Sequence, residues 1–140
     1  FPGRYPGIEQ AVIDQVVARA MVEDVLIICF DFPTLVDVKK LEPRLRTGAL
    51  VNAAWMRERQ AKAPEEIVDE VIRATGADWF LPTASVVTEP LVRAVHARGL
   101  RIGVWTVNTP AEMAQLAQYG VDAITSDRPD ELKRVLGSAR

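Results

Sequence analysis

Residues 101–125, RIGVWTVNTPAEMAQLAQYGVDAIT, contain a short apolar run, an amphipathic segment and a second apolar run. The first run, 101–107, is rich in β-branched and aromatic residues, which is typical of a strand buried on both faces of a parallel sheet. Thr109 and Glu112 have the spacing of a capping box, which predicts that a helix begins there. Gly120 suits the left-handed conformation that ends many helices. The stretch therefore predicts a strand, a helix and a second strand in succession.

The same alternation continues through the rest of the chain. Further apolar runs predict strands at 25–30, 46–51, 78–81 and 122–125. Apolar stripes at three- and four-residue spacing predict helices between them. Five of these helices are expected to carry a proline in the first turn, at Pro33, Pro64, Pro90, Pro110 and Pro129. The segment 52–63 is expected to be either a loop or a short helix.

Two architectures fit one helix followed by five strand–helix units. Both are α/β folds with a parallel sheet and right-handed crossovers. A doubly wound sheet is complete at about this length, whereas a (β/α)8 barrel needs ~250 residues. The first predicted helix, around Ile8 and Val12, has no strand before it, and the chain begins with Phe1. These features favour the C-terminal five units of a (β/α)8 TIM barrel, with residues 1–140 as part of a single barrel domain.

The composition is that of an ordinary globular protein. The 140 residues are 49% hydrophobic and 26% charged, with a net charge of -2, which excludes a disordered chain and gives no general attraction to nucleic acid. No apolar run approaches the ~20 residues needed to span a membrane, and a cytoplasmic location is expected. Cys29 is the only cysteine, so no internal disulfide is possible, and a small buried hydrophobe is the expected role.

Reactive groups in parallel α/β proteins lie at the carboxyl ends of the strands. The residues at the predicted ends include two carboxylates but no histidine and no lysine; they are Phe30, Asp31, Val51, Asn52, Pro82, Thr83, Trp105, Thr106, Asn108, Ser126, Asp127 and Arg128. Asp31 and Asp127 either cap the helices that follow them or bind a cation. Trp105 either faces the mouth of a barrel or packs between the sheet and its helices. His96, the only histidine, falls on a predicted helix, where a surface or half-buried role is expected.

Five segments together resemble the glycerophosphodiester phosphodiesterase family. Residues 104–108, VWTVN, and 120–130, GVDAITSDRPD, resemble the family's closing V-W-T-V-N and G-V-D-G-I-I-T-D-R-P-D. Upstream, 28–31, ICFD, resembles its S-S-F-D strand end, with cysteine where serine is usual. Residues 43–48, PRLRTG, resemble P-x-L-x-T-G, and 4–9, RYPGIE, resemble the segment after the family's E-I-K strand. The likeness runs in order over nearly the whole chain.

The resemblance implies a barrel enzyme that hydrolyses glycerophosphodiesters to an alcohol and glycerol 3-phosphate, in phospholipid breakdown or phosphate scavenging. It also implies a divalent metal, Mg or Ca, and two catalytic histidines. The H-R-G, E-x-D, H-D and E-x-K motifs that carry these groups are not in this sequence, so no catalytic or metal residue is assigned to it. Phe30 and Trp105 are expected to contact the glycerol or the leaving group.

The chain alone is therefore expected to be inactive. The alternative is a non-catalytic half-barrel that acts as a binding or assembly module and self-associates through its exposed edge strands.

Overall fold

The structure, a computed structural model, describes residues 5–138. Phe1 and Arg4, which entered the sequence analysis, lie outside the described residues. The strands are β1 Leu26–Cys29, β2 Arg46–Val51, β3 Trp79–Pro82, β4 Arg101–Val104 and β5 Ala123–Ile124. The helices are α1 Ile8–Ala18, α2 Phe32–Leu41, α3 Ala53–Arg57, α4 Pro64–Thr75, α5 Glu89–Ala97, α6 Pro110–Tyr119 and α7 Pro129–Ser138, with a 3-10 turn, η1, at Ala84–Val86.

The predicted order of one helix and five strand–helix units is confirmed. All five strands begin within two residues of their predicted first residues, although β4 ends at Val104 and not at Val107. The segment 52–63 contains the short helix α3, so the helical alternative holds there. None of the helices in residues 5–138 is long and apolar enough to cross a membrane.

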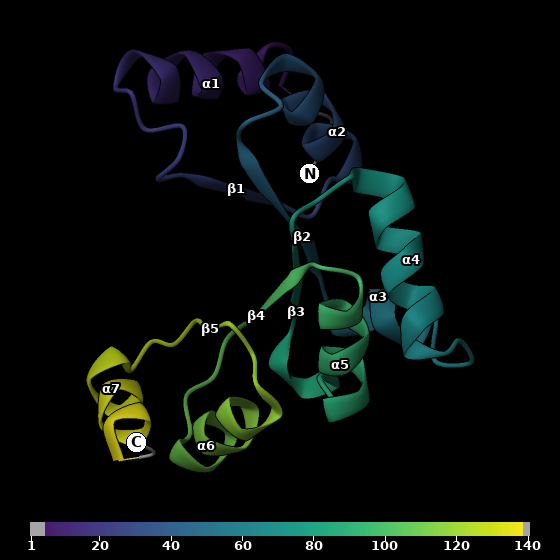
Figure 1. The fold of residues 1–140 in the computed structure, drawn as a ribbon, viewed down its shortest axis with the longest axis vertical. Helices are drawn as coiled ribbons and strands as arrows, with labels where there is room; N and C mark the ends of the chain where they lie inside the picture. Colours follow the sequence, from purple (N-terminus) through teal and green to yellow (C-terminus); the bar gives the residue numbers. More distant parts are fainter. Residues whose placement is uncertain (1–4, 139–140) are drawn as a thin grey trace.

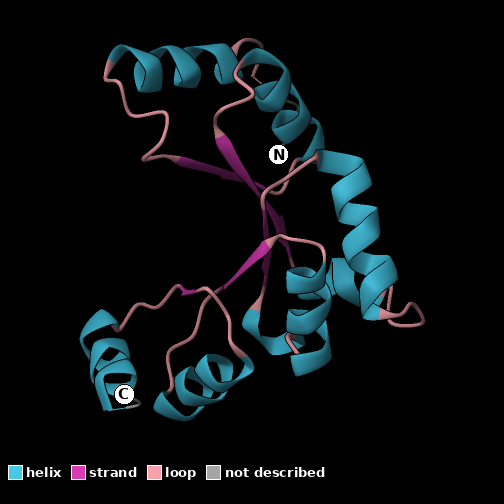
Figure 2. Cartoon of the chain, viewed as in Figure 1, coloured by secondary structure: helices cyan, strands magenta, loops and turns pink. Residues whose placement is uncertain are grey.

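The sheet is parallel throughout, and its strands follow the order of the chain, β1-β2-β3-β4-β5. The helices lie along one side of the sheet, with α1 and α7 at opposite ends of the row, and the other side is open (Figures 1 and 2). A doubly wound sheet reverses its strand order and carries helices on both faces. The doubly wound alternative is therefore wrong, and the chain forms a curved sheet with one layer of helices.

The main core lies between the sheet and its helices. Alternate strand residues point to opposite faces, and on the helical face Ala49, Phe80 and Ile102 are fully buried. Leu35 of α2 and Val68 of α4 pack into the same core cluster. Helix starts follow the predicted pattern, since a proline lies in the first turn of α2, α4, α5 and α6. The apolar periodicity of α4, α5 and α6 thus corresponds to this core, whereas Ile8 and Val12 of α1 are exposed and Val16 packs into a second cluster.

An aspartate locks the amino end of β3 to its neighbour. The Asp78 N–H donates to the Thr47 carbonyl at 2.9 Å, and its Oδ2 accepts the Thr47 N–H at 2.8 Å. Lys39 of α2 donates to the same carboxylate at 2.6 Å. One side chain therefore joins two strands and a helix, on the edge of the sheet opposite the carboxyl ends.

The same arrangement recurs two strands later. Asp122, just before β5, exchanges two hydrogen bonds with Ile102, at 2.9 Å through its N–H and at 2.8 Å through its carboxylate. His96 of α5 takes the place of the lysine, with Nε2 2.9 Å from Oδ2. Both aspartates follow a glycine in the left-handed region, Gly76 at φ 61° and Gly120 at φ 84°. His96 is thus an exposed helical residue, as predicted, and the structure adds Asp122 as its partner.

Candidate functional site

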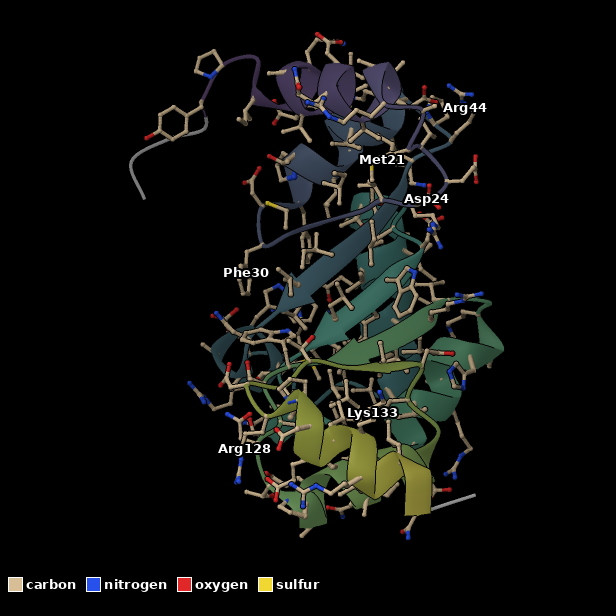
Figure 3. The ribbon with its side chains drawn as sticks, turned by 90° about the vertical axis from the view of Figure 1, so that its left-hand side faces the viewer. Met21, Asp24, Phe30, Arg44, Arg128 and Lys133 are labelled. Carbon is tan, nitrogen blue, oxygen red and sulfur yellow. The ribbon has the colours of Figure 1, made fainter. Side chains whose placement is uncertain are left out.

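The face of the sheet that carries no helices is its inner face, and the carboxyl ends of the strands form one edge of it. Figure 3 looks at this open side, with Phe30 and Arg128 toward one edge and Asp24 toward the other. A cavity of about 400 Å³ lies on the inner face. Its lining is mostly apolar and comes from all five strands and the residues that follow them: Leu26, Ile28, Phe30, Leu50, Trp79, Leu81, Gly103, Trp105, Thr106, Ala123 and Thr125.

Two glycines make room for the floor of this cavity. A Cβ at Gly48 would lie 2.5 Å from Leu81 Cδ1, and one at Gly103 would lie 2.8 Å from Leu81 Cδ2. Both distances are shorter than carbon atoms tolerate. Leu81 of β3 therefore extends over the two strands that flank it, β2 and β4, and glycine at 48 and 103 allows it to do so.

Phe30 and Trp105, the two residues expected to contact substrate, lie together at the mouth. Their ring centroids are 5.5 Å apart with an interplanar angle of 85°, an edge-to-face contact. The indole Nε1 of Trp105 donates to the Leu81 carbonyl at 2.8 Å, which fixes the ring. Phe30 is 54% exposed. Of the two placements open to Trp105, the structure shows the one that faces the mouth.

Asn108 joins the last two loops at this end of the sheet. Its Nδ2 donates to Asp127 Oδ2 at 2.8 Å, and its Oδ1 accepts the Asp127 N–H at 2.9 Å and the Ser126 hydroxyl at 3.2 Å. Asp127 precedes α7, and its carboxylate accepts its hydrogen bond from Asn108. Asp31 does cap its helix, because its carboxylate accepts the Thr34 N–H at 3.0 Å.

A cation shared by Asp31 and Asp127 does not fit this geometry, because β1 and β5 lie at opposite edges of the sheet. Within residues 5–138 no group of three or more His, Cys, Asp or Glu side chains is placed to hold a metal ion. The metal implied by the resemblance therefore does not fit the residues that the structure describes.

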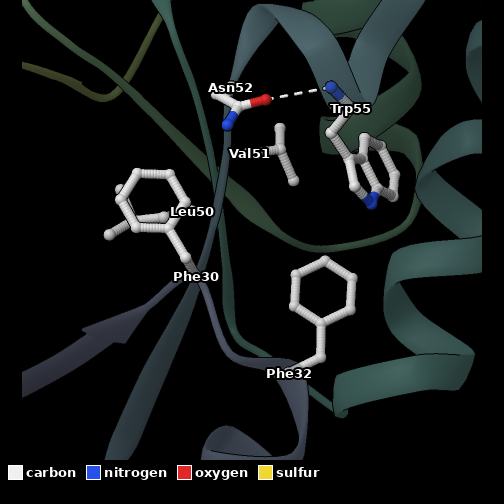
Figure 4. Close-up of a pocket in the computed structure, with 6 residues that line it drawn as sticks. All are labelled: Phe30, Phe32, Leu50, Val51, Asn52 and Trp55. Atoms are coloured by element: carbon white, nitrogen blue, oxygen red, sulfur yellow. Dashed lines mark hydrogen bonds between the residues drawn. The ribbon is translucent and has the colours of Figure 1, made fainter. Parts of the chain in front are cut away.

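A second, smaller cavity lies beside Phe30, above the carboxyl ends of β1 and β2. Its volume is about 170 Å³, and it is lined by Phe30, Phe32, Leu50, Val51, Asn52 and Trp55 (Figure 4). Phe32 and Trp55 meet edge to face at 5.9 Å and 61°. Neither residue was predicted to belong to a site, and the one signal in the sequence is a tryptophan in the segment 52–63, which carries three basic residues and one acidic residue.

Ion pairs hold the outer side of this cavity in place. The Arg59 guanidinium lies 3.6 Å from the centroid of the Trp55 ring, within cation–π range. It also pairs with Glu70 at 2.8 Å, and Lys62 pairs with the same carboxylate at 2.6 Å. Hydrogen bonds from Arg59 and then Lys62 hold the pKa of Glu70 below its ordinary value. Trp55 is therefore fixed from the solvent side by Arg59, which the ion pair with Glu70 holds in place.

Comparison with known proteins gives one consistent family. The model of the glycerophosphoryl diester phosphodiesterase family matches residues 7–131. A glycerophosphodiester phosphodiesterase of Bacillus subtilis is 29% identical over 140 residues, which cover 96% of this chain and 46% of that protein. One from Caldanaerobacter subterraneus is 28% identical, over 91% of this chain and 49% of its own length. The chain thus spans about half the length of the curated relatives it matches.

Solved structures agree in fold. A crystal structure from Silicibacter pomeroyi, assigned to the same family, has a TM-score of 0.82 and 27% identity, over 94% of this chain and 44% of its own. An Oleispira antarctica phosphodiesterase in complex with the product sn-glycerol-3-phosphate has a TM-score of 0.69 and 20% identity, over 95% of this chain and 52% of its own. These relatives are TIM barrels, and the five units described above correspond to about half of each barrel.

Proposed function

The chain belongs to the glycerophosphoryl diester phosphodiesterase family, and from that premise we propose that it is the C-terminal part of an enzyme that hydrolyses glycerophosphodiesters. Water adds to phosphorus, the bond from phosphorus to the alcohol oxygen breaks, and the alcohol and glycerol 3-phosphate are released. The family match over residues 7–131 carries this proposal. The complex of the Oleispira relative with sn-glycerol-3-phosphate supports the same product.

The contribution of this chain is one wall of the substrate site. Phe30 and Trp105 form an edge-to-face pair at the carboxyl ends of the strands, where TIM-barrel enzymes bind substrate. Such a wall contacts the glycerol carbons or the leaving alcohol and keeps water from that side. The hydrogen bond from the indole to Leu81 orients Trp105 for this contact.

The acid–base groups and a divalent metal, Mg²⁺ or Ca²⁺, belong in this proposal to other parts of a complete barrel. The described residues offer no cluster that binds a metal, and His96 is engaged with Asp122 at the amino ends of the strands. No step of the reaction is therefore assigned to a metal held by this chain, and the 140-residue chain alone is proposed to be inactive.

A half-barrel that self-associates is the second candidate. Ile28 is 50% exposed and Phe30 is 54% exposed, and both line the apolar inner face, where a continuous exposed patch marks an interaction surface. β1 and β5 each have one neighbouring strand, so each leaves an edge for pairing. Light scattering distinguishes the candidates, since a concentration-independent monomer mass argues against assembly.

A chimera tests the enzymatic proposal. The part of the Bacillus subtilis relative that this chain does not match is joined to residues 5–138 of this chain. A folded chimera is expected to release glycerol 3-phosphate from glycerophosphocholine when Mg²⁺ or Ca²⁺ is present. Replacement of Phe30 and Trp105 by alanine is expected to lower kcat/KM. A chimera that unfolds cooperatively, binds the metal and yet releases no product contradicts the proposal.

A further inference from the structure

We propose that a third cavity, between η1 and α6, binds a neutral sugar of monosaccharide size. Its volume is about 200 Å³, below the ~300–1,000 Å³ that is typical of sites for drug-sized ligands. Of the described residues that line it, none also lines either cavity at the carboxyl ends of the strands. The site is therefore separate from the proposed substrate wall, and the inference goes beyond the proposed function.

One wall of the cavity is a polar face of α6. Glu112, Gln115 and Tyr119 lie three and four residues apart, so their side chains share one face of the helix. The Gln115 Nε2 donates to the Tyr119 hydroxyl at 2.7 Å, and the Thr109 hydroxyl donates to Glu112 Oε2 at 2.7 Å. Tyr119 is half-buried and packs against the main core. The polar groups of this wall are thus held by contacts within the chain.

The other wall comes from η1 and the residue that follows it. The Ala84 N–H donates to the Trp105 carbonyl at 2.7 Å, and the Val87 N–H donates to the Ala84 carbonyl at 3.1 Å. These bonds fix the position of η1 beside the end of β4. Ser85 adds a hydroxyl to the lining, and Val87 adds an apolar side chain.

The lining combines hydrogen-bond acceptors, donors and apolar surface. The carboxylate of Glu112 and the Oε1 of Gln115 are acceptors, whereas the hydroxyls of Ser85 and Tyr119 can donate as well as accept. Sugar hydroxyls also donate and accept, so they can pair with both kinds of group. The Tyr119 ring and Val87 offer apolar surface to the C–H groups of a sugar ring. This mixture matches a sugar better than a purely apolar ligand.

The charge of the site favours a neutral ligand. Among the described residues that line the cavity, Glu112 alone is charged. It lies in the first turn of α6, where the positive end of the helix dipole offsets its negative charge. An anion would be repelled by the carboxylate, and a cation would meet the positive end of the helix. A neutral polyhydroxy compound avoids both costs.

The two tyrosines of the chain, Tyr5 and Tyr119, provide a probe and an internal control in one NMR spectrum. The rings are labelled with ¹³C in the full 140-residue chain, and Tyr5→Phe assigns the two sets of resonances. Tyr5 precedes α1, at the far end of the row of helices from α7, and is 79% exposed. D-Glucose is expected to shift the Tyr119 resonances and to leave those of Tyr5 in place.

Parallel titrations at equal concentrations test the chemical class of the ligand. Butylammonium and phosphate are expected to shift neither tyrosine. Glycerol is expected to bind more weakly than glucose, because it has hydroxyls but no ring of carbons to contact Tyr119. Tyr119 resonances that glucose does not move, an equal response to butylammonium or phosphate, or equal affinity for glycerol overturns the proposal.

Substitutions on α6 provide the second readout. Gln115→Leu and Glu112→Gln are each expected to weaken glucose binding about fivefold, since each removes a hydrogen-bond partner of the sugar. Both positions are exposed, and glutamine at 112 retains the capping box, so the fold is expected to persist. Gln118→Leu is the matched control, because Gln118 is exposed on the same helix and does not line the cavity. Equal glucose affinity in the Gln115 and Gln118 variants contradicts the assignment.

Discussion

Replacement of Asn108 by alanine removes the hydrogen bonds that join the loop after β4 to the loop after β5. The substitution removes three side-chain hydrogen bonds, one to the Asp127 carboxylate and two from Asp127 and Ser126. A typical bond contributes about 0.5–1.5 kcal/mol, and a bond to a charged group more. Since this site is largely exposed to solvent, we expect a total loss of about 2 kcal/mol.

The assay is urea unfolding followed by circular dichroism, in which the midpoint falls while the m-value stays constant. For a chain of this length, about 2 kcal/mol corresponds to a decrease in Tm of about 7 °C. Gln115→Ala is the matched control, because it removes one exposed amide that bonds Tyr119 on the same helix. We expect that control to change stability by less than about 0.5 kcal/mol.

A double-mutant cycle with Asp127→Ala isolates the bond between the two loops. If Asn108 and Asp127 act as a pair, the double variant loses less stability than the two single variants added together. The reasoning is refuted if Asn108→Ala is no more destabilising than Gln115→Ala, or if the two effects simply add.

Three further predictions concern the framework. Asp31→Ala removes the N-cap of α2 and is expected to cost about 1 kcal/mol in urea unfolding, whereas Asp31→Asn retains most of the cap. Gly120→Ala places a Cβ at φ 84° and is expected to cost about 1 kcal/mol; an unchanged Tm contradicts the left-handed conformation. Hydrogen bonds from Arg44 lower the pKa of Glu42 from 4.5 to about 2. A carboxyl group with a lowered pKa stabilises the folded state at pH values above its ordinary pKa. This stabilisation is lost as the pH falls through the pKa of the folded state. Glu42→Gln is therefore expected to reduce the loss of stability between pH 4.5 and about 2, measured as urea midpoints across that range.

Local patterns in the sequence were sufficient for the fold. The capping residues, the first-turn prolines and the glycines at 76 and 120 act within a few residues of themselves, so each could be assigned from its neighbours. The run 46–51 matches β2 in full, and 122–125 contains the two-residue β5. Because no strand was predicted before the first helix, a partial barrel was favoured over a doubly wound sheet. The single layer of helices and the strand order confirm the barrel-type arrangement.

The contacts that define the site required the structure. Asn108 and Asp127 are far apart in the sequence, and nothing local shows that the carboxylate prefers the amide of another loop to the start of α7. The same holds for Trp55, which contacts Phe32 of α2, and for Arg59 on its ring, which pairs with Glu70 of α4. Phe30 and Trp105 were the exception, because both lie near the carboxyl ends of predicted strands of a parallel sheet and such ends meet at one edge.

The most direct test of the central claim is the release of glycerol 3-phosphate from glycerophosphocholine by the purified 140-residue chain with added Mg²⁺ or Ca²⁺. The full-length Bacillus subtilis relative serves as the positive control under the same conditions. If this chain supplies a wall of the substrate site while the metal and the acid–base groups come from elsewhere in the barrel, no release above the uncatalysed rate is expected. Robust turnover by the chain alone contradicts that assignment.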